Sequence, residues 1–113
     1  MEHISLNNIR MNVVQTSANG VVNEQTIFNF SQIENVVQAN YSGGRITKGF
    51  LVGKIHGTIL EFSYCQLQTD GQLDYGFSTS ELSLNANGKI RLVENFEWKS
   101  RDGQSGVNIF QEL

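Results

Sequence analysis

The sequence predicts an all-β protein: a single domain over residues 1–113, built as an eight-stranded antiparallel up-and-down meander that closes into a small barrel. Turn dipeptides of the Asn-Gly, Asp-Gly and Gly-Gly type recur along the chain, and each favours a tight hairpin. The runs between them are rich in Val, Ile, Thr, Tyr and Phe, and no proline interrupts them. The cross-strand alignments that these turns imply also agree with one another.

The turns divide the chain into its expected strands. The turn dipeptides lie at 19–20, 43–44, 70–71, 87–88 and 102–103, and two further breaks are expected at 31–35 and 53–57. The eight expected strands are residues 9–18, 21–30, 35–42, 45–53, 57–66, 72–83, 89–100 and 104–112.

A two-residue turn fixes which side chains face each other across a hairpin. In the first half of the chain it predicts the pairs Met11 with Phe28, Val13 with Thr26, Tyr41 with Ile46, Ala39 with Lys48, and Val37 with Phe50. This alignment places Lys48 on the inner face of the barrel, as a charge that could partner an inner carboxylate.

In the second half, the same rule predicts four rows across four strands. The rows are Gln66, Tyr75, Ser100 and Ser105; then Tyr64, Phe77, Trp98 and Val107; then Phe62, Thr79, Phe96 and Ile109; then Leu60, Glu81, Glu94 and Gln111. One face is therefore aromatic and aliphatic, and the other is polar. An eight-stranded barrel of this kind is just filled by side chains or holds one small ligand.

The inner face supplies the candidate ligand site. Its expected residues are Tyr41, Lys48, Phe62, Tyr64, Tyr75, Phe77, Glu81, Glu94 and Trp98. Glu81 and Glu94 are expected to face each other at one mouth of the barrel. If that mouth is dry, one carboxyl keeps its proton, and the pair could do acid–base work or bind a cation. If it is wet, both are ordinary rim carboxylates.

The stretch "YSGGRITKGFLVG", residues 41–53, contains four glycines and two cations. A phosphate loop would join a strand to a helix and end in Lys followed by Ser or Thr, whereas here Lys54 precedes Ile55 within a strand. The stretch is therefore interpreted as a hairpin turn, with a weak anion-binding nest at Gly43, Gly44 and Arg45 as the functional alternative.

Composition excludes several classes of function. The net charge of −3 and the pI near 5.2 argue against nucleic-acid and anionic-membrane binding. His3, His56 and the single cysteine, Cys65, lack metal-ligand spacing, so neither a metal nor another cofactor is expected. The N-terminal residues are acidic and polar, unlike a secretory signal, which makes the cytoplasm the expected location.

The elements "YSGG-x-I-x-x-G-x-L-x-G", from Tyr41 to Gly53, and "NGKIRL…E-x-W", from Asn87 to Trp98, carry a resemblance. From about Val14 onward the chain resembles short uncharacterised bacterial all-β proteins that are often labelled N-acetylglutamate synthase. The resemblance implies a calycin-like, lipocalin-like small barrel and no particular site. An acetyltransferase would need a mixed α/β fold with a pyrophosphate loop, and neither is visible in the sequence.

Three functions follow from this interpretation. The first is a non-catalytic barrel that binds a small apolar or amphipathic ligand. The second is a small enzyme that uses Glu81 and Glu94 in the barrel mouth. The third is a structural homo-oligomer with a solid core, whose outer wall pairs with a second copy. Fold alone does not choose among them.

Overall fold

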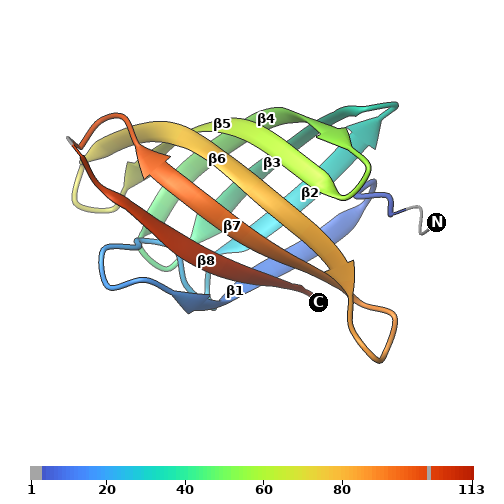
Figure 1. The fold of residues 1–113 in the computed structure, drawn as a ribbon. Helices are drawn as coiled ribbons and strands as arrows, with labels where there is room; N and C mark the ends of the chain where they lie inside the picture. Colours follow the sequence, from blue (N-terminus) through green and yellow to red (C-terminus); the bar gives the residue numbers. More distant parts are fainter. Residues whose placement is uncertain (1–3, 102) are drawn as a thin grey trace.

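The strands of the computed structural model, which describes residues 4–101 and 103–113, form one closed antiparallel barrel (Figure 1). The strands are β1 (Ile9–Thr16), β2 (Ile27–Ile33), β3 (Val36–Gly43), β4 (Ile46–His56), β5 (Ile59–Gln68), β6 (Leu73–Leu84), β7 (Ile90–Trp98) and β8 (Ser105–Glu112). Each strand pairs with the next, and β1 pairs with β8 to close the sheet. The predicted eight-stranded meander is therefore confirmed.

Alternation along each strand divides the residues between the barrel interior and the outer wall, because successive side chains of a strand point to opposite faces. The clearest case is β5, in which every second residue from Leu60 to Gln68 is buried. Buried side chains from all eight strands meet in one apolar core. The described part of the chain contains no helix long and apolar enough to cross a membrane.

The turns on either side of β6 each contain one residue more than predicted. The Gln68 N–H donates to the Gln72 carbonyl at 2.9 Å, and the Asn85 N–H donates to the Lys89 carbonyl at 2.8 Å. Each turn therefore has three residues between its paired ends, and the alignment shifts by one. The predicted place of Phe77 between Tyr64 and Trp98 is wrong, because Gly76 stands there.

The one-residue shifts in the two turns cancel, so that β5 and β7 keep their predicted alignment relative to each other. Tyr64 and Trp98 consequently share an inward-facing row, as predicted, while the whole of β6 is inverted. Its inner face carries small and polar side chains such as Ser78 and Ser80, and Tyr75 and Phe77 lie on the outer wall.

The connection between β7 and β8 is longer still. The Trp98 N–H donates to the Gln104 carbonyl at 2.9 Å, which leaves residues 99–103 as the turn. Within it, Asp102 of the predicted turn dipeptide lies outside the described residues. Asn108 therefore faces Glu94 from inside the barrel, and the predicted inward placement of Val107 and Ile109 is wrong.

The β3–β4 hairpin also departs from the predicted alignment. Gly43 and Gly44 have the expected positive φ angles of 110° and 62°. An irregularity between Tyr41 and Gly43 changes the pairing, however, so that Tyr41 faces Gly49 rather than Ile46. Lys48 therefore points outward, over the ring of the exposed Phe50 at 4.9 Å, instead of into the barrel.

The pairing of Met11 with Phe28 is confirmed, although no tight turn produces it. The expected strand over 21–30 begins only at Ile27, and residues 17–26 form a long connection. Val21 and Val22 in this connection are buried at one end of the barrel.

Candidate functional site

A small cavity lies inside the barrel, at the end where the β1–β2 connection crosses it. Its volume is about 20 Å³, roughly enough for one water molecule. Aromatic and aliphatic side chains form most of its wall, and a few polar groups converge on it. Its lining residues from the strands are Phe28, Tyr41, Leu51, Phe62, Tyr64, Gln66, Glu94, Phe96, Trp98 and Asn108.

Glu94, at the centre of β7, supplies a buried carboxyl group to this cavity. Burial raises the pKa of the Glu94 carboxyl, and hydrogen bonds from Ser78 and Asn108 partly offset that effect. The Ser78 hydroxyl donates to Oε2, and the Asn108 side-chain amide donates to Oε1 at 2.9 Å. Thr16 in turn donates to Asn108 Oδ1. A polar chain thus links β6, β7, β8 and β1 through the interior.

Two tyrosines approach the cavity from β3 and β5. The Tyr41 hydroxyl donates to Gln66 Oε1 at 2.7 Å, and the Tyr64 hydroxyl donates to the Glu97 carbonyl at 3.2 Å. Burial, followed by the nearby Glu94 carboxyl, raises the pKa of both phenols above the ordinary value of 10.0. Both hydroxyls therefore stay protonated and can act as hydrogen-bond donors or acceptors at neutral pH.

Two buried polar atoms have no partner among the described residues: Trp98 Nε1 and Ser80 Oγ. Trp98 lines the cavity, and Ser80 stands opposite Glu94 on the inner face of β6. Leaving a buried donor unpaired costs about 1–3 kcal/mol. A residue of the cavity wall thus carries a buried N–H that has no partner among the described residues.

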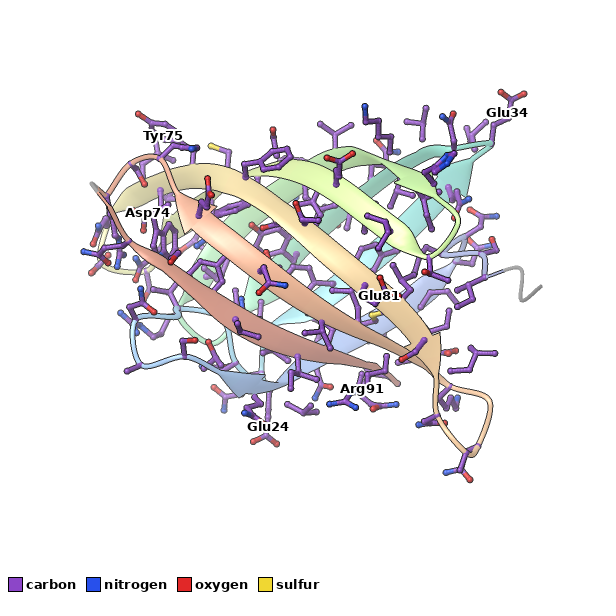
Figure 2. The ribbon with its side chains drawn as sticks, viewed as in Figure 1. Glu24, Glu34, Asp74, Tyr75, Glu81 and Arg91 are labelled. Atoms are coloured by element: carbon purple, nitrogen blue, oxygen red, sulfur yellow. The ribbon has the colours of Figure 1, made fainter. Side chains whose placement is uncertain are left out.

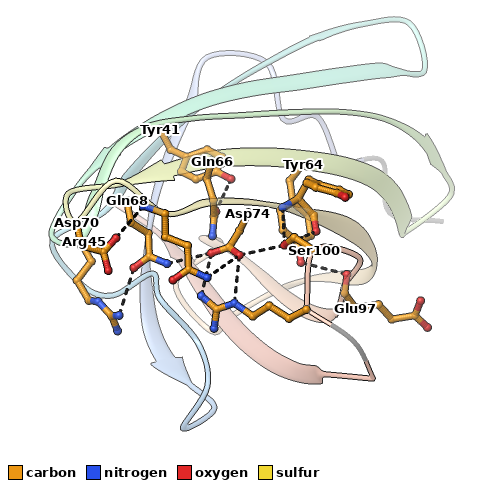
Figure 3. A network of polar contacts seen from close by, with 12 residues as sticks. Tyr41, Arg45, Tyr64, Gln66, Gln68, Asp70, Asp74, Glu97 and Ser100 are labelled. Atoms are coloured by element: carbon orange, nitrogen blue, oxygen red, sulfur yellow. Dashed lines mark hydrogen bonds and ion pairs between the residues drawn. The ribbon is translucent and has the colours of Figure 1, made fainter.

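A second polar cluster lies beside the cavity, around the buried Asp74 at the start of β6 (Figure 3). Arg101 donates to both carboxylate oxygens, from Nε at 3.1 Å and from Nη2 at 2.8 Å. Gln68 and Ser100 donate to the same carboxylate. Burial opposes ionisation of Asp74, but these hydrogen bonds and the guanidinium charge outweigh it and lower the pKa of the carboxyl.

The structure brings together five of the predicted ligand-site residues: Tyr41, Phe62, Tyr64, Glu94 and Trp98. The inward placement predicted for the other four is wrong. Lys48, Tyr75, Phe77 and Glu81 all lie on the outer wall. Figure 2 shows Tyr75 and Glu81 on the outside of the barrel.

The predicted carboxylate pair does not form. Ser80, not Glu81, faces Glu94 across β6 and β7, because the turn at 86–88 has an extra residue. Glu81 points outward and accepts a hydrogen bond from Thr58 at 3.0 Å. Glu94 therefore has no carboxyl partner across β6 and β7, and the buried Asp74 carboxyl is paired with Arg101 instead.

The predicted anion nest has a packing role in this structure. A Cβ atom at Gly43 would come within 2.1 Å of the Gln25 carbonyl oxygen, and one at Gly44 within 2.6 Å of the Asn23 side chain. These glycines thus make room for the β1–β2 connection. Arg45 donates from Nη2 to Gln68 Oε1 at 3.2 Å.

The structure adds site residues that the sequence reasoning missed: Val21, Val22, Gln66, Ser78 and Asn108. The predicted rows imply the inner face for Gln66, which the structure confirms, and the outer wall for Ser78 and Asn108, which is wrong. No sequence signal gives the length of the turns that invert these two residues. In residues 4–101 and 103–113, no three His, Cys, Asp or Glu side chains form a group that could hold a metal ion, and His3 lies outside those ranges.

Comparison with known proteins gives one result. The family model described as "Avidin-like protein" matches residues 4–113, which is nearly the whole chain. Searches of curated proteins and of solved structures returned no significant match. The closed eight-stranded antiparallel barrel agrees with the calycin-type architecture of that family. The chain therefore belongs to the avidin-like family.

Proposed function

We propose that this protein is a non-catalytic binding barrel for a small apolar or amphipathic ligand, held at the end of the barrel that contains Glu94 and Trp98. One observation carries the proposal: aromatic walls enclose a buried carboxyl group and an indole N–H that has no partner among the described residues. Ligand sites commonly combine an apolar lining with a few convergent polar groups. Small-ligand binding is also what membership of the avidin-like family supports.

The aromatic walls would bind the apolar part of the ligand. Phe96 and Trp98 meet edge to face with ring centroids 5.5 Å apart, and Tyr64 meets Trp98 in the same way at 5.8 Å. Such packing holds the rings in fixed orientations, so that little side-chain freedom is lost when a ligand binds. The polar part would meet Glu94 and the Trp98 indole N–H.

The surroundings of Glu94 favour binding over catalysis. Both of its oxygens already accept hydrogen bonds, from Ser78 and from Asn108, and the outward Glu81 cannot serve as a second acid or base. The alternative function, an enzyme built on the Glu81–Glu94 pair, therefore loses its second group. Acetyl transfer from a nucleotide-containing donor also lacks support, because the described chain offers no strand-to-helix phosphate loop.

Titration of the single tryptophan tests the proposal directly. Trp98 is the only tryptophan of the chain and lines the cavity, so its fluorescence reports on occupancy. Avidin-like barrels bind small ligands such as biotin, which makes biotin the first probe and 1-anilinonaphthalene-8-sulfonate (ANS) a less selective second. Saturable quenching that Glu94→Gln or Tyr41→Phe weakens at least fivefold supports the site. Unchanged Trp98 emission with both probes contradicts it.

We propose further that the protein self-associates through its outer wall, as the expected homo-oligomer. Three large apolar side chains on β4 and β6, the two strands that flank β5, support this: Phe50, Val52 and Tyr75 are 56%, 57% and 51% exposed. Cys65 on β5 pairs with both Phe50 and Tyr75, so the two rings flank it on one face. Exposed apolar patches of this kind mark interaction sites. We also propose the cytoplasm as the location, because the single, exposed cysteine Cys65 suits a reducing compartment.

Sedimentation equilibrium tests the self-association. Phe50→Ser combined with Tyr75→Ser should shift the protein toward monomer, whereas Val14→Ser, at a 48% exposed site on β1, should leave the mass unchanged. A wild-type protein that is monomeric at high micromolar concentration would exclude this assembly.

A further inference from the structure

The β1–β2 connection, residues 17–26, is fixed at both ends. At its start, Ser17 donates its N–H to the Val107 carbonyl at 3.0 Å, and the Val107 N–H donates to Ser17 Oγ at 2.9 Å. At its end, Thr26 donates its hydroxyl to the Gly43 carbonyl at 3.1 Å and its N–H to the Asn23 carbonyl at 3.0 Å. The connection is thus tied to β8 and to the β3–β4 turn.

The middle of the connection has a different character. Val21 and Val22 are only 4% and 6% exposed, and both line the cavity. Among the described residues, no hydrogen bond joins either valine to the rest of the chain. Apolar contact with the barrel interior therefore holds this part in place, while hydrogen bonds hold its two ends.

The cavity needs an opening before it can take a ligand. Its volume of about 20 Å³ is far smaller than the roughly 300–1,000 Å³ of common ligand pockets. Ten of its lining residues belong to hydrogen-bonded strands, and the other three are Gly20, Val21 and Val22. Moving a strand would break the closed ladder. Moving the valines breaks apolar contacts and short-range hydrogen bonds within the connection, such as those that the Gly20 and Thr26 amides donate.

We propose that Val21 and Val22 are the specificity-determining residues of the ligand site, acting as a displaceable plug that occupies the position of the ligand's apolar part. This inference rests on the proposed function. It also defines the ligand class: a compact molecule with an apolar body that replaces the two valine side chains and a polar end that reaches Trp98 Nε1 or Glu94. A larger plug side chain would restrict the site, and a smaller one would open it.

Truncation of the plug tests the proposal, with ANS as the probe and quenching of Trp98 emission as the signal. Val21→Ala combined with Val22→Ala should bind ANS at least tenfold more tightly than wild type. The matched control is Val13→Ala combined with Val37→Ala, which truncates two valines of the barrel wall that are at least as buried and do not line the cavity. The control should bind ANS as wild type does.

The outcomes separate this inference from the proposed function. Equal ANS binding by wild type, plug variant and control overturns the plug and leaves the ligand site standing. No quenching of Trp98 in any of the three overturns both. If the double variant does not fold, Val22→Ala alone is used with the same criteria.

Hydrogen exchange in the wild-type protein provides a second measurement. The amides of Gly20 and Thr26 form hydrogen bonds within the connection, and the Leu82 amide donates to Thr58 at the far end of the barrel. A displaceable plug predicts that Gly20 and Thr26 exchange through a local opening that low urea does not accelerate. Exchange of all three amides only by global unfolding would contradict it.

Discussion

The guanidinium carbon of Arg101 lies 4.4 Å from the centroid of the Trp98 ring, on the β7–β8 turn that follows this tryptophan. The same guanidinium forms the ion pair with Asp74, whose side chain is 1% exposed against 20% for Arg101. One cation therefore connects the buried carboxylate at the start of β6 to a wall of the ligand site.

Asp74→Asn should destabilise the protein, because it leaves the partly buried Arg101 without its counter-charge. Breaking a buried pair typically costs about 3–5 kcal/mol, and the partial exposure of Arg101 places the expected loss near 2–3 kcal/mol. Urea unfolding at pH 7 measures it. Glu97→Gln, which removes the exposed partner of Lys99, is the control and should change stability by less than about 0.5 kcal/mol. A similar small effect for Asp74→Asn would contradict the buried pair.

The pH dependence of this loss follows from the direction of the shift. The pKa of Asp74 is lowered in the folded state, so its stabilising contribution is present above the unfolded value, near 3.8, and disappears as the pH falls through the folded value. The difference in unfolding free energy between wild type and Asp74→Asn should therefore shrink in acid. A difference that stays constant from pH 7 to pH 2 would rule out the linkage.

Glu94→Gln should have the opposite effect at neutral pH. The raised pKa of Glu94 means that the folded state holds its proton more tightly than the unfolded state, so Glu94 lowers stability as the pH rises above about 4.5. Glutamine can still bond to Ser78 and Asn108 without a charge. We expect the variant to be about 1 kcal/mol more stable than wild type at pH 8 and close to it at pH 4.

The ionisable groups near Glu94 do not reverse the expected direction of this stability change. The raised pKa values of Tyr41 and Tyr64 keep both phenols neutral in this range. Chemical unfolding at the two pH values is the measurement. A variant that is less stable than wild type at pH 8 would mean that an ionised Glu94 is satisfied inside the barrel.

Gly49→Ala should disturb the ligand site through Tyr41. A Cβ atom at Gly49 would approach ring carbons of Tyr41 to 2.2 Å, and the hydrogen bond from Tyr41 to Gln66 restrains that ring. Overpacking of this kind costs about 1–3 kcal/mol. The variant should also weaken ANS-induced quenching of Trp98.

Gly57→Ala provides the comparison for that experiment. A Cβ atom there meets nothing within 4 Å, and only its φ of +63° opposes the change, at about 1–2 kcal/mol. It should lose stability without any effect on probe binding. Equal binding losses in both variants would remove the special role of the contact between Gly49 and Tyr41.

Tyr41→Phe should destabilise the fold by about 1–2 kcal/mol, because it leaves Gln66 Oε1 buried without its donor. Thermal unfolding measures this loss. Tyr75→Phe on the outer wall removes an exposed hydroxyl and should have no measurable effect. If the two substitutions lower stability by the same amount, the interior hydrogen bond of Tyr41 contributes nothing to the stability of the fold.

The fold was predictable from the sequence because turn dipeptides and apolar alternation are local signals. They placed Phe62, Tyr64, Glu94, Phe96 and Trp98 on the inner face. The inversion of β6 was not predictable in the same way. Leu73, Tyr75 and Phe77 make its outer face the more apolar one at that end, so burial alone selects the wrong side.

The turn geometry explains how that inversion arises. A type I′ turn needs positive φ at both central residues. In the two turns that flank β6, only Gly71 and Gly88 have it, at 91° and 76°. A three-residue loop, with a turn followed by one left-handed residue, satisfies that geometry and moves the alignment by one. Dipeptide composition cannot distinguish the two cases.

The pairing of β1 with β8 has a consequence for folding. Every other ladder in the barrel joins consecutive strands, but the seam brings Met11 beside Glu112, nearly the whole chain away. Pairs of strands that are consecutive in the chain can form soon after both strands are synthesised. Pairing of β1 with β8 closes the largest loop and therefore has the largest entropic cost, so it forms last. During synthesis the growing meander would carry two open edges until β8 emerges from the ribosome. The interval before closure is therefore when this protein is most exposed to edge-to-edge aggregation.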